Sequence, residues 1–589
     1  MERQVVRFSG FEVDLHAREL RRAGSRVRLQ DQPFHILAML LERRGDIVTR
    51  EEMRERLWPE GTFVDFEHSV NAAIKRLRAA LGDTADNPRF VETLHRRGYR
   101  FVAPIDQAAA LAGPAPAPAN APASSDRRPR LVILPFTNLS GDHVPDYFSD
   151  GLTEEMIAQV GRRCASRIGV LARTSSMLYK NVMRAASDIG EALHADYLVE
   201  GSVRREGDRV RITAQLIETK GETHLWAESY DRHLADCLAV QTEVASQIAH
   251  ALTQELLPQS SAIAIGTTNP AAYQAFLRGR FHWNLQGPGG LEPAVESYDQ
   301  AILLDPRLAK AYTARARARV SLCDYYMIET RIGLETARQD ALRALEFDSG
   351  DAEAHLALAE VRRTLDWDWE GAEVEYRRAL TSNPNCEAAH KYYAVFLAAR
   401  GRAEAPVMAD RACEIDPLCL TMNTAAATVH YFRGDYDRAL DRFIRTLDMD
   451  PSFVPARRGL AASLVQFGRI EEAIGNLTAL PDDRGDPVTQ AWLGHALAVQ
   501  GDKAGARKIA GALVRRAERG FVPAYHLAML YAGLEDLDAA FAQLDRACET
   551  RDPALDTVDV EPRFWILRGD PRYARLMEKL KLNPRLAQV

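Results

Sequence analysis

Prolines recur at a nearly fixed interval in the second half of this 589-residue chain. Pro384, Pro417 and Pro451 are 33 and 34 residues apart, and each follows an Asn or Asp that ends a helical pattern. Proline has no N–H to donate within a helix, so each one marks a boundary between helices. A period of this length predicts an array of helix pairs, because each pair leaves an apolar face that only its neighbour can cover. Residues 270–589 are therefore expected to be all-α.

Small and aromatic residues keep a constant distance from these prolines. An alanine lies 12 residues and an aromatic residue 8 residues before Pro384, Pro451 and the earlier Pro306: Ala372 and Tyr376, Ala439 and Phe443, and Ala294 and Tyr298. This spacing resembles the tetratricopeptide repeat. The resemblance implies about eight or nine repeats, an insertion near Cys323 to Arg331, and a final helix near Tyr573 to Leu580. It also implies a superhelix whose concave face binds a protein or peptide partner.

A different pattern occupies residues 67–81 near the start of the chain. Val70, Ile74, Leu77 and Leu81 form one apolar stripe at helical spacing, and Gly82 supplies a stop. The polar residues Asn71, Lys75 and Arg78 form a second stripe, with Arg76 beside it. Cations and an amide on an outward helix face suit a DNA groove, although such a face is more often simply solvated.

The sequence around this helix favours the interpretation that it binds DNA. Four short alternating runs predict an antiparallel sheet, and they are followed by a helix at residues 31–44. Thr49 and Glu52 form a capping box for a short helix at residues 50–57. Two strands, at residues 90–93 and 99–102, flank a cationic tip made of His95, Arg96 and Arg97. Residues 1–105 hold 19 Lys and Arg against 16 Asp and Glu, whereas the whole chain has a net charge of −7.

Helix, helix and basic hairpin resemble the winged helix-turn-helix of OmpR/PhoB-type transcriptional regulators, an α+β domain. Val70 to Gly82 and the closing Gly98-Tyr99-Arg100-Phe101 carry the resemblance, which covers residues 1–105. It implies that the residues facing double-stranded DNA are Asn71, Ala73, Lys75, Arg76 and Arg78 of the helix and Thr93, His95, Arg96 and Arg97 of the wing. Ala73 stands where relatives often have a polar side chain, so base reading there would be limited to apolar contact.

Residues 106–128 are rich in Ala and Pro, which is typical of an extended linker. Residues 129–258 then alternate helical and strand patterns, with the clearest strands at 197–205, 209–217 and 223–230. Leu134 to Asp142, Phe148 to Glu155 and Glu200 to Arg205 resemble a TolB-like domain of mixed α/β fold. The DNA-binding pattern begins near residue 3, so no receiver domain is expected upstream of it.

No catalytic, cofactor or metal site is predicted. The acidic residues Asp142, Asp146, Asp150, Glu154 and Glu155 could suggest a metal, but their spacing better fits a loop that leads into a helix N-terminus. Seven scattered cysteines without a C-x-x-C motif favour free thiols in a reducing compartment. There is no secretion signal and no apolar run of membrane length, so a cytoplasmic protein without membrane contact is expected.

These patterns together predict a bacterial, non-enzymatic regulator of transcription built from several domains. Its winged helix would bind promoter DNA, while the TolB-like and repeat regions sense a signal or recruit a partner, with RNA polymerase as one candidate. The alternative is a repeat-based interaction scaffold in which DNA binding is secondary. An enzyme with a site in residues 129–258 has little support.

Overall fold

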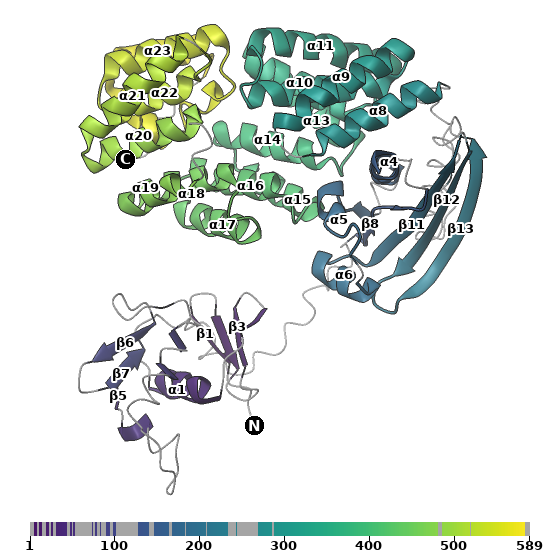
Figure 1. The fold of residues 1–589 in the computed structure, drawn as a ribbon. Coiled ribbons are helices and arrows are strands. Elements are labelled where there is room, and N and C mark those ends of the chain that lie inside the picture. The colour runs from purple at the N-terminus through teal and green to yellow at the C-terminus, as the bar shows by residue number, and fades with distance from the viewer. Residues whose placement is uncertain are drawn as a thin grey trace, which may run out of the picture. The chain divides into compact units, whose positions relative to one another are not determined.

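The computed structural model divides into two compact units, residues 1–126 and 127–589 (Figure 1). In the first unit it describes residues 5–8, 11–14, 19–22, 25–27, 31–43, 47–49, 51–53, 73–74, 77–78, 83, 90–94 and 98–101. In the second it describes residues 128–582 except 141–145, 164–167, 183, 208, 234–242, 244–268, 286–287, 481–485 and 519. The linker at residues 106–128 lies outside these ranges except for Arg128.

The described residues of the first unit form two antiparallel sheets, one long helix and short helical stretches at residues 51–53, 73–74 and 77–78. The four expected opening strands are confirmed as a sheet in chain order: β1 (Val5–Phe8), β2 (Phe11–Asp14), β3 (Glu19–Arg22) and β4 (Ser25–Val27). Helix α1 (Asp31–Glu42) follows. A second sheet has the order β5-β7-β6, from β5 (Ile47–Val48), β6 (Val91–Leu94) and β7 (Gly98–Phe101). Val13, Leu37 and Tyr99 are buried together in one core between the sheets and the helices.

The capping box is present as predicted. The backbone N–H of Thr49 donates to Glu52 Oε2 at 2.8 Å, and the N–H of Glu52 donates to Thr49 Oγ1 at 3.2 Å. The two side chains thus satisfy donors that the first helical turn leaves without partners. The hydrogen bond from the Thr49 backbone is also the main reason that the pKa of Glu52 is lowered.

The second unit opens with a mixed sheet of order β10-β8-β11-β12-β13. Strand β9 also pairs with β11. Its strands are β8 (Arg130–Ile133), β9 (Thr137–Asn138), β10 (Gly169–Val170), β11 (Tyr197–Glu206), β12 (Arg209–Glu218) and β13 (Thr223–His233). Three helices accompany it: α4 (Tyr147–Arg163), α5 (Arg173–Met177) and α6 (Ala186–Leu193). The three long strands predicted from the sequence are confirmed, whereas β9 and α5 are too short to have been predicted.

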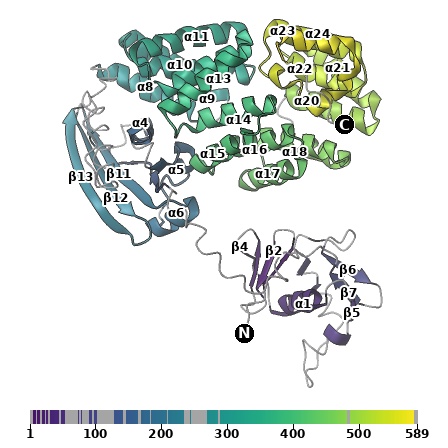
Figure 2. The same cartoon turned by 180° about the vertical axis from the view of Figure 1, so that it is seen from behind.

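Sixteen helices follow as eight pairs in the described part of the second unit. They are α8 (Pro270–Trp283), α9 (Pro288–Leu304), α10 (Ala309–Asp324), α11 (Thr330–Phe347), α12 (Ala352–Val361), α13 (Trp369–Ser382), α14 (Glu387–Ala399), α15 (Ala405–Ile415), α16 (Leu420–Phe432), α17 (Tyr436–Met449), α18 (Val454–Gln466), α19 (Ile470–Thr478), α20 (Pro487–Gln500), α21 (Lys503–Ala517), α22 (Ala524–Gly533) and α23 (Leu537–Thr550). The short helices η3 (Arg362–Asp366), η4 (Leu555–Thr557) and η5 (Pro562–Gly569) and the final α24 (Pro571–Lys579) complete the array (Figures 1 and 2). None of the helices that the structure describes is long and apolar enough to cross a membrane.

The periodic residues occupy the helix crossings, as the repeat pattern predicts. Tyr298, Tyr376 and Phe443 are among the largest fully buried side chains of the chain. A small residue faces the ring where the helices approach closely: a Cβ on Gly459 of α18 would lie 2.2 Å from the ring of Phe443 in α17. The contact between these neighbouring pairs therefore depends on an aromatic ring that fills the space left by a missing side chain.

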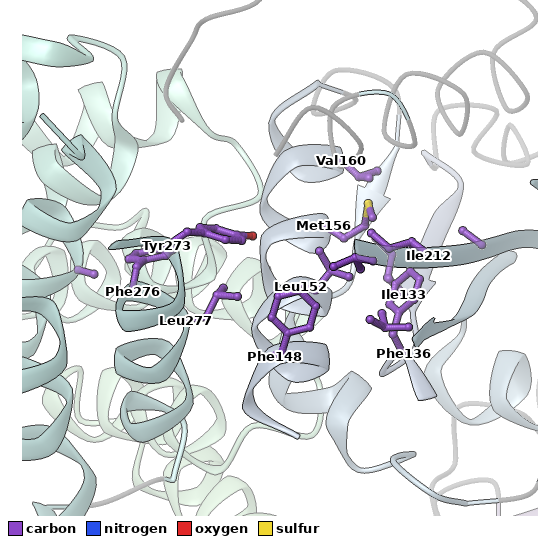
Figure 3. Packing of buried hydrophobic residues seen from close by; sticks show 14 of the residues in the cluster. Ile133, Phe136, Phe148, Leu152, Met156, Val160, Ile212, Tyr273, Phe276 and Leu277 are labelled. Atoms are coloured by element: carbon purple, nitrogen blue, oxygen red, sulfur yellow. The ribbon is translucent and has the colours of Figure 1, made fainter. Parts of the chain in front are cut away.

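Helix α4 connects the sheet to the first repeats. Figure 3 shows Phe148, Leu152 and Met156 of α4 lying between side chains of α8 and side chains of the sheet. All of them belong to a single buried cluster that continues from the sheet strands into α8, α9 and α10. The α/β region and the first repeats therefore share one hydrophobic core.

Candidate nucleic-acid interface

The helix predicted to read DNA is described at four positions, and all four face the interior. Ala73, Ile74 and Leu77 are buried in the core that also contains Val91 and Phe101 of the wing strands. Ala73 precedes Ile74 and lies one turn before Leu77, so it falls within the same buried face. The expectation that Ala73 faces outward therefore differs from the structure, which gives its methyl group a packing role.

Arg78 also differs from the outward position expected for it, since its side chain is only 8% exposed. Its guanidinium Nη2 donates to the carbonyl oxygen of Val91 at 2.6 Å and to Thr93 Oγ1 at 2.8 Å. Both acceptors belong to β6, the first strand of the wing hairpin. Arg78 thus fixes this strand to the helix by charge-assisted hydrogen bonds.

Asp83 makes a second connection between the same two elements. Its backbone N–H donates to the carbonyl of Arg78 at 2.8 Å, and its Oδ2 accepts from the N–H groups of Phe90 and Val91 at 3.2 and 2.8 Å. Sequence reasoning missed Asp83. The available signal was its place directly after the predicted stop at Gly82, where a carboxylate can accept from free backbone N–H groups.

Strand pairing and one ion pair hold the base of the wing hairpin. Strands β6 and β7 pair antiparallel, and Arg100 donates to Glu92 Oε2 through Nε at 3.0 Å and Nη2 at 2.6 Å. Gly98 begins β7 with a φ of +144°, and a Cβ there would lie 2.2 Å from the carbonyl oxygen of Val48. Only glycine fits this position without strain. Thr93, the predicted wing residue that the structure describes, is exposed.

The remaining predicted DNA-facing residues lie outside the described residues: Asn71, Lys75, Arg76, His95, Arg96 and Arg97. The structure thus brings Arg78 and Thr93 together and places Ala73 in the core.

Four of the five acidic residues of the central region bind cations of the protein itself, and the fifth, Asp142, lies outside the described residues. Lys180 pairs with Asp146 at 3.1 Å and with Asp150 at 2.8 Å. Glu154 pairs with Arg280, and Glu155 with Lys310. Among the described residues, no group of three His, Cys, Asp or Glu side chains has the geometry of a metal site. These carboxylates therefore serve the packing of α4.

Two stretches of the chain match protein families. Residues 24–101 match the family described as "Transcriptional regulatory protein, C terminal", and residues 433–496 match the tetratricopeptide repeat.

Individual relatives cover different shares of the chain. A putative adenylate cyclase 3 of Rhizobium meliloti is 32% identical over 246 residues, which are 41% of each protein, so the chain spans less than half of that relative. The transcriptional regulator HilA of Salmonella typhimurium is 22% identical over 428 residues, 72% of each protein. The RstA DNA-binding domain of Klebsiella pneumoniae, solved in complex with the RstA box, is 29% identical. It covers 17% of this chain and 97% of that one, with a TM-score of 0.16.

Proposed function

We propose that this chain, whose residues 24–101 are an OmpR/PhoB-type DNA-binding domain and whose helix pairs are tetratricopeptide repeats, is a sequence-specific regulator of transcription. The match of residues 24–101 to the C-terminal domain of transcriptional regulatory proteins carries the proposal. The 22% identity with HilA, named as a transcriptional regulator, supports it over a longer part of the chain.

In this proposal the DNA contacts come from Asn71, Lys75 and Arg76 of the helix and from the wing. In a regular helix of 3.6 residues per turn, Lys75 would lie roughly opposite the buried face made by Ala73, Ile74 and Leu77, and Arg76 would lie to one side of it. The cations meet phosphates or guanine edges, and Asn71 can pair with adenine. Four wing residues complete the interface: Thr93, His95, Arg96 and Arg97. Arg78 acts through β6, because its Nη2 donates to Val91 and Thr93.

A selection of double-stranded DNA from a random pool by the full chain tests this function. A regulator recovers a defined sequence that is bound at least about 10³-fold tighter than unselected DNA at physiological salt. Recovery of no shared sequence, with binding that depends on salt alone, would refute specific recognition.

The repeats and the α/β region supply the second half of the proposed function, the reception of a signal or the recruitment of a protein such as RNA polymerase. The repeat family supports a protein partner. Cross-linking of the full chain on its selected DNA, with and without RNA polymerase, tests whether RNA polymerase is this partner. A partner that binds the chain equally well in the absence of DNA, and whose binding leaves transcription unchanged, would favour the scaffold alternative.

A further inference from the structure

Four polar side chains form a row along the inner side of the repeat array. Tyr326, Arg363, Arg400 and Tyr431 stand at or just beyond the C-terminal ends of α10, α12, α14 and α16, the first helices of four consecutive pairs. First helices of neighbouring pairs pack on one another, which puts them on the inner side of the curve. The four residues are called the polar ladder below.

The polar ladder is occupied by an acidic segment from the far end of the chain. Residues 552–561 contain four carboxylates and no cation. The Tyr326 hydroxyl donates to Asp552 Oδ1 at 2.9 Å, and Arg363 Nη1 donates to Asp556 Oδ1 at 3.0 Å. Arg400 Nη1 lies 3.7 Å from Asp556 Oδ2, and the Tyr431 hydroxyl donates to Glu561 Oε1 at 2.7 Å.

The contacts follow the same order on both sides. Moving from α10 to α16, the ladder meets residue 552, then 556, then 561. Arg363 also donates to the carbonyl of Pro553 at 3.0 Å, so the backbone is recognised as well as the side chains. One contact per helix pair along a segment of the chain is how a repeat surface binds an extended ligand.

The acidic segment has two faces. Leu555, Val558 and Phe564 are buried with α22, α23 and α24 in the core of the last repeat. The carboxylates of Asp552, Asp556 and Glu561 accept from residues that lie 226, 193 and 130 positions away in the sequence, and Glu561 also forms a buried ion pair with Arg563 beside it. The contact with the ladder is polar at these carboxylates. Trp367, which follows η3, is buried in the same cluster as Leu555 and Phe564, so displacement of the segment must also release this apolar contact.

Arg400 is the ladder residue with the fewest hydrogen bonds to a carboxylate. Its Nε and Nη2 atoms are buried without a hydrogen-bond partner, and Asp556 is its carboxylate neighbour at 3.7 Å. The ring of Phe396 lies 3.7 Å from the guanidinium carbon and that of Trp369 lies 4.1 Å from it. Burial lowers the pKa of Arg400 to about 10, which still leaves it charged at neutral pH. A guanidinium with two unused N–H donors can donate to a further carboxylate.

We propose that the polar ladder is a binding surface for acidic, extended protein segments, and that residues 552–561 occupy it within the same chain. A partner protein with carboxylates at matching intervals then binds by displacing this segment. The intervals between the recognised carboxylates are four and five residues, from Asp552 to Asp556 and on to Glu561. In the unpartnered chain the array stays closed.

Binding of a fluorescent peptide of residues 549–563 to the full chain tests the proposal. The paired change Asp556→Asn and Glu561→Gln weakens the internal occupant, so the peptide should bind this variant at least tenfold tighter than the unmodified chain. The internal segment lowers the apparent affinity of the unmodified chain by keeping most molecules closed. Adding Arg363→Ala and Arg400→Ala to the same variant should remove the gain.

Asp559→Asn is the matched control, because the carboxylate of Asp559 accepts from Tyr573 within the C-terminal end itself. This variant should bind the peptide no better than the unmodified chain. Equal peptide binding by all variants, or none by a folded paired variant, overturns the proposal.

A second measurement needs no variant. An excess of the peptide, isotopically labelled so that its fragments separate by mass, should displace the segment and raise deuterium uptake in residues 552–561 several-fold. An unchanged uptake at saturating peptide would show that the segment is a fixed part of the fold and overturn the proposal.

Discussion

Arg78 shows how one residue can change its role once its partners are known. A cation on a DNA-reading helix is expected to meet phosphate, yet its guanidinium is directed to Val91 and Thr93 of the wing. Loss of Arg78 should therefore act on the position of the wing, whereas loss of a phosphate contact acts on the release of counterions.

Lys75→Ala and Arg78→Ala should accordingly differ in how DNA binding depends on salt concentration. Lys75→Ala should weaken binding and reduce the slope of log K against log salt by about 1, because one phosphate contact is lost. Arg78→Ala should weaken binding with an unchanged slope. A reduced slope for Arg78→Ala, in a variant shown by circular dichroism to be folded, would indicate that Arg78 contacts a DNA phosphate directly.

His355 and His390 occupy similar places in consecutive repeats and differ in their partners. His355 Nδ1 lies 2.7 Å from Glu375 Oε2 and its Nε2 lies 3.1 Å from the carbonyl of Ser349. Two acceptors require two N–H donors, which only the charged imidazolium provides. The hydrogen bond to Glu375 raises the pKa of His355, whereas burial lowers the pKa of His390.

These pKa shifts predict a pH-dependent difference between two variants. A raised pKa means that the stabilisation by His355 is fully present below the unfolded value of 6.5 and is lost as the pH rises through the folded value. His355→Gln should cost about 1.5–3 kcal/mol at pH 6, the range for a charged hydrogen bond, and less at pH 9. His390→Gln, the control, should not cost more at pH 6. Urea unfolding at both pH values measures the costs, and a pH-independent cost for His355→Gln would contradict the assignment.

At the scale of elements, the repeats depend on a close fit between small and aromatic residues. Gly459 of α18 leaves the space that the ring of Phe443 fills, whereas Gly475 of α19 has nothing within 4 Å of an added Cβ. Gly459→Ala should destabilise α17 and α18 by about 1–3 kcal/mol, as overpacking does. Gly475→Ala should instead stabilise its helix by roughly 0.5–1 kcal/mol. Native-state hydrogen exchange of these helices distinguishes the two, and similar effects of both changes would exclude steric fit as the cause.

Local patterns predicted most of the elements. The Thr49–Glu52 capping box, the strands that begin at Tyr197 and Arg209, and the positions of Tyr376 and Phe443 each follow from residues within one or two turns or one hairpin. Periodicity alone did not place Arg78, because a residue at the edge of an apolar stripe faces inward or outward according to what packs against it.

Contacts between distant elements could not be predicted in the same way. Glu154 was read as a helix N-terminal acid, but its partners Arg280 and Asn284 lie in and just after α8, more than 120 residues later. Tyr326 and Asp552 are 226 residues apart and meet because of the curvature of the whole array. The sequence contains no local signal for that curvature.

On the scale of the molecule, charged groups reinforce the apolar contact between α4 and the repeats. Glu154 is nearly buried and binds Arg280, with Arg173 at 3.6 Å and Asn284 Nδ2 at 2.5 Å. Removing one partner of a buried pair leaves the other charge uncompensated. Asp146, just before α4, is largely exposed and pairs with Lys180 at 3.1 Å.

Glu154→Ala should therefore destabilise residues 127–582 by about 3–5 kcal/mol, whereas Asp146→Ala should cost less than about 1 kcal/mol. Calorimetry of the full chain should show the Glu154→Ala transition lowered for the α/β region and the first repeats together, because they share one core. Two separate transitions for these regions in the unmodified chain would contradict the shared core.

The contacts of Asp552, Asp556 and Glu561 with four consecutive helix pairs have a consequence for how this protein can change over generations. An open solenoid gains or loses a unit by duplication or deletion, and its neighbours simply restack. Here the chain end must return to α10, α12, α14 and α16, so an added pair between α16 and α22 would carry Asp552 away from Tyr326. Closure therefore fixes the repeat number, and new lineages can alter the surface of each unit more easily than the number of units.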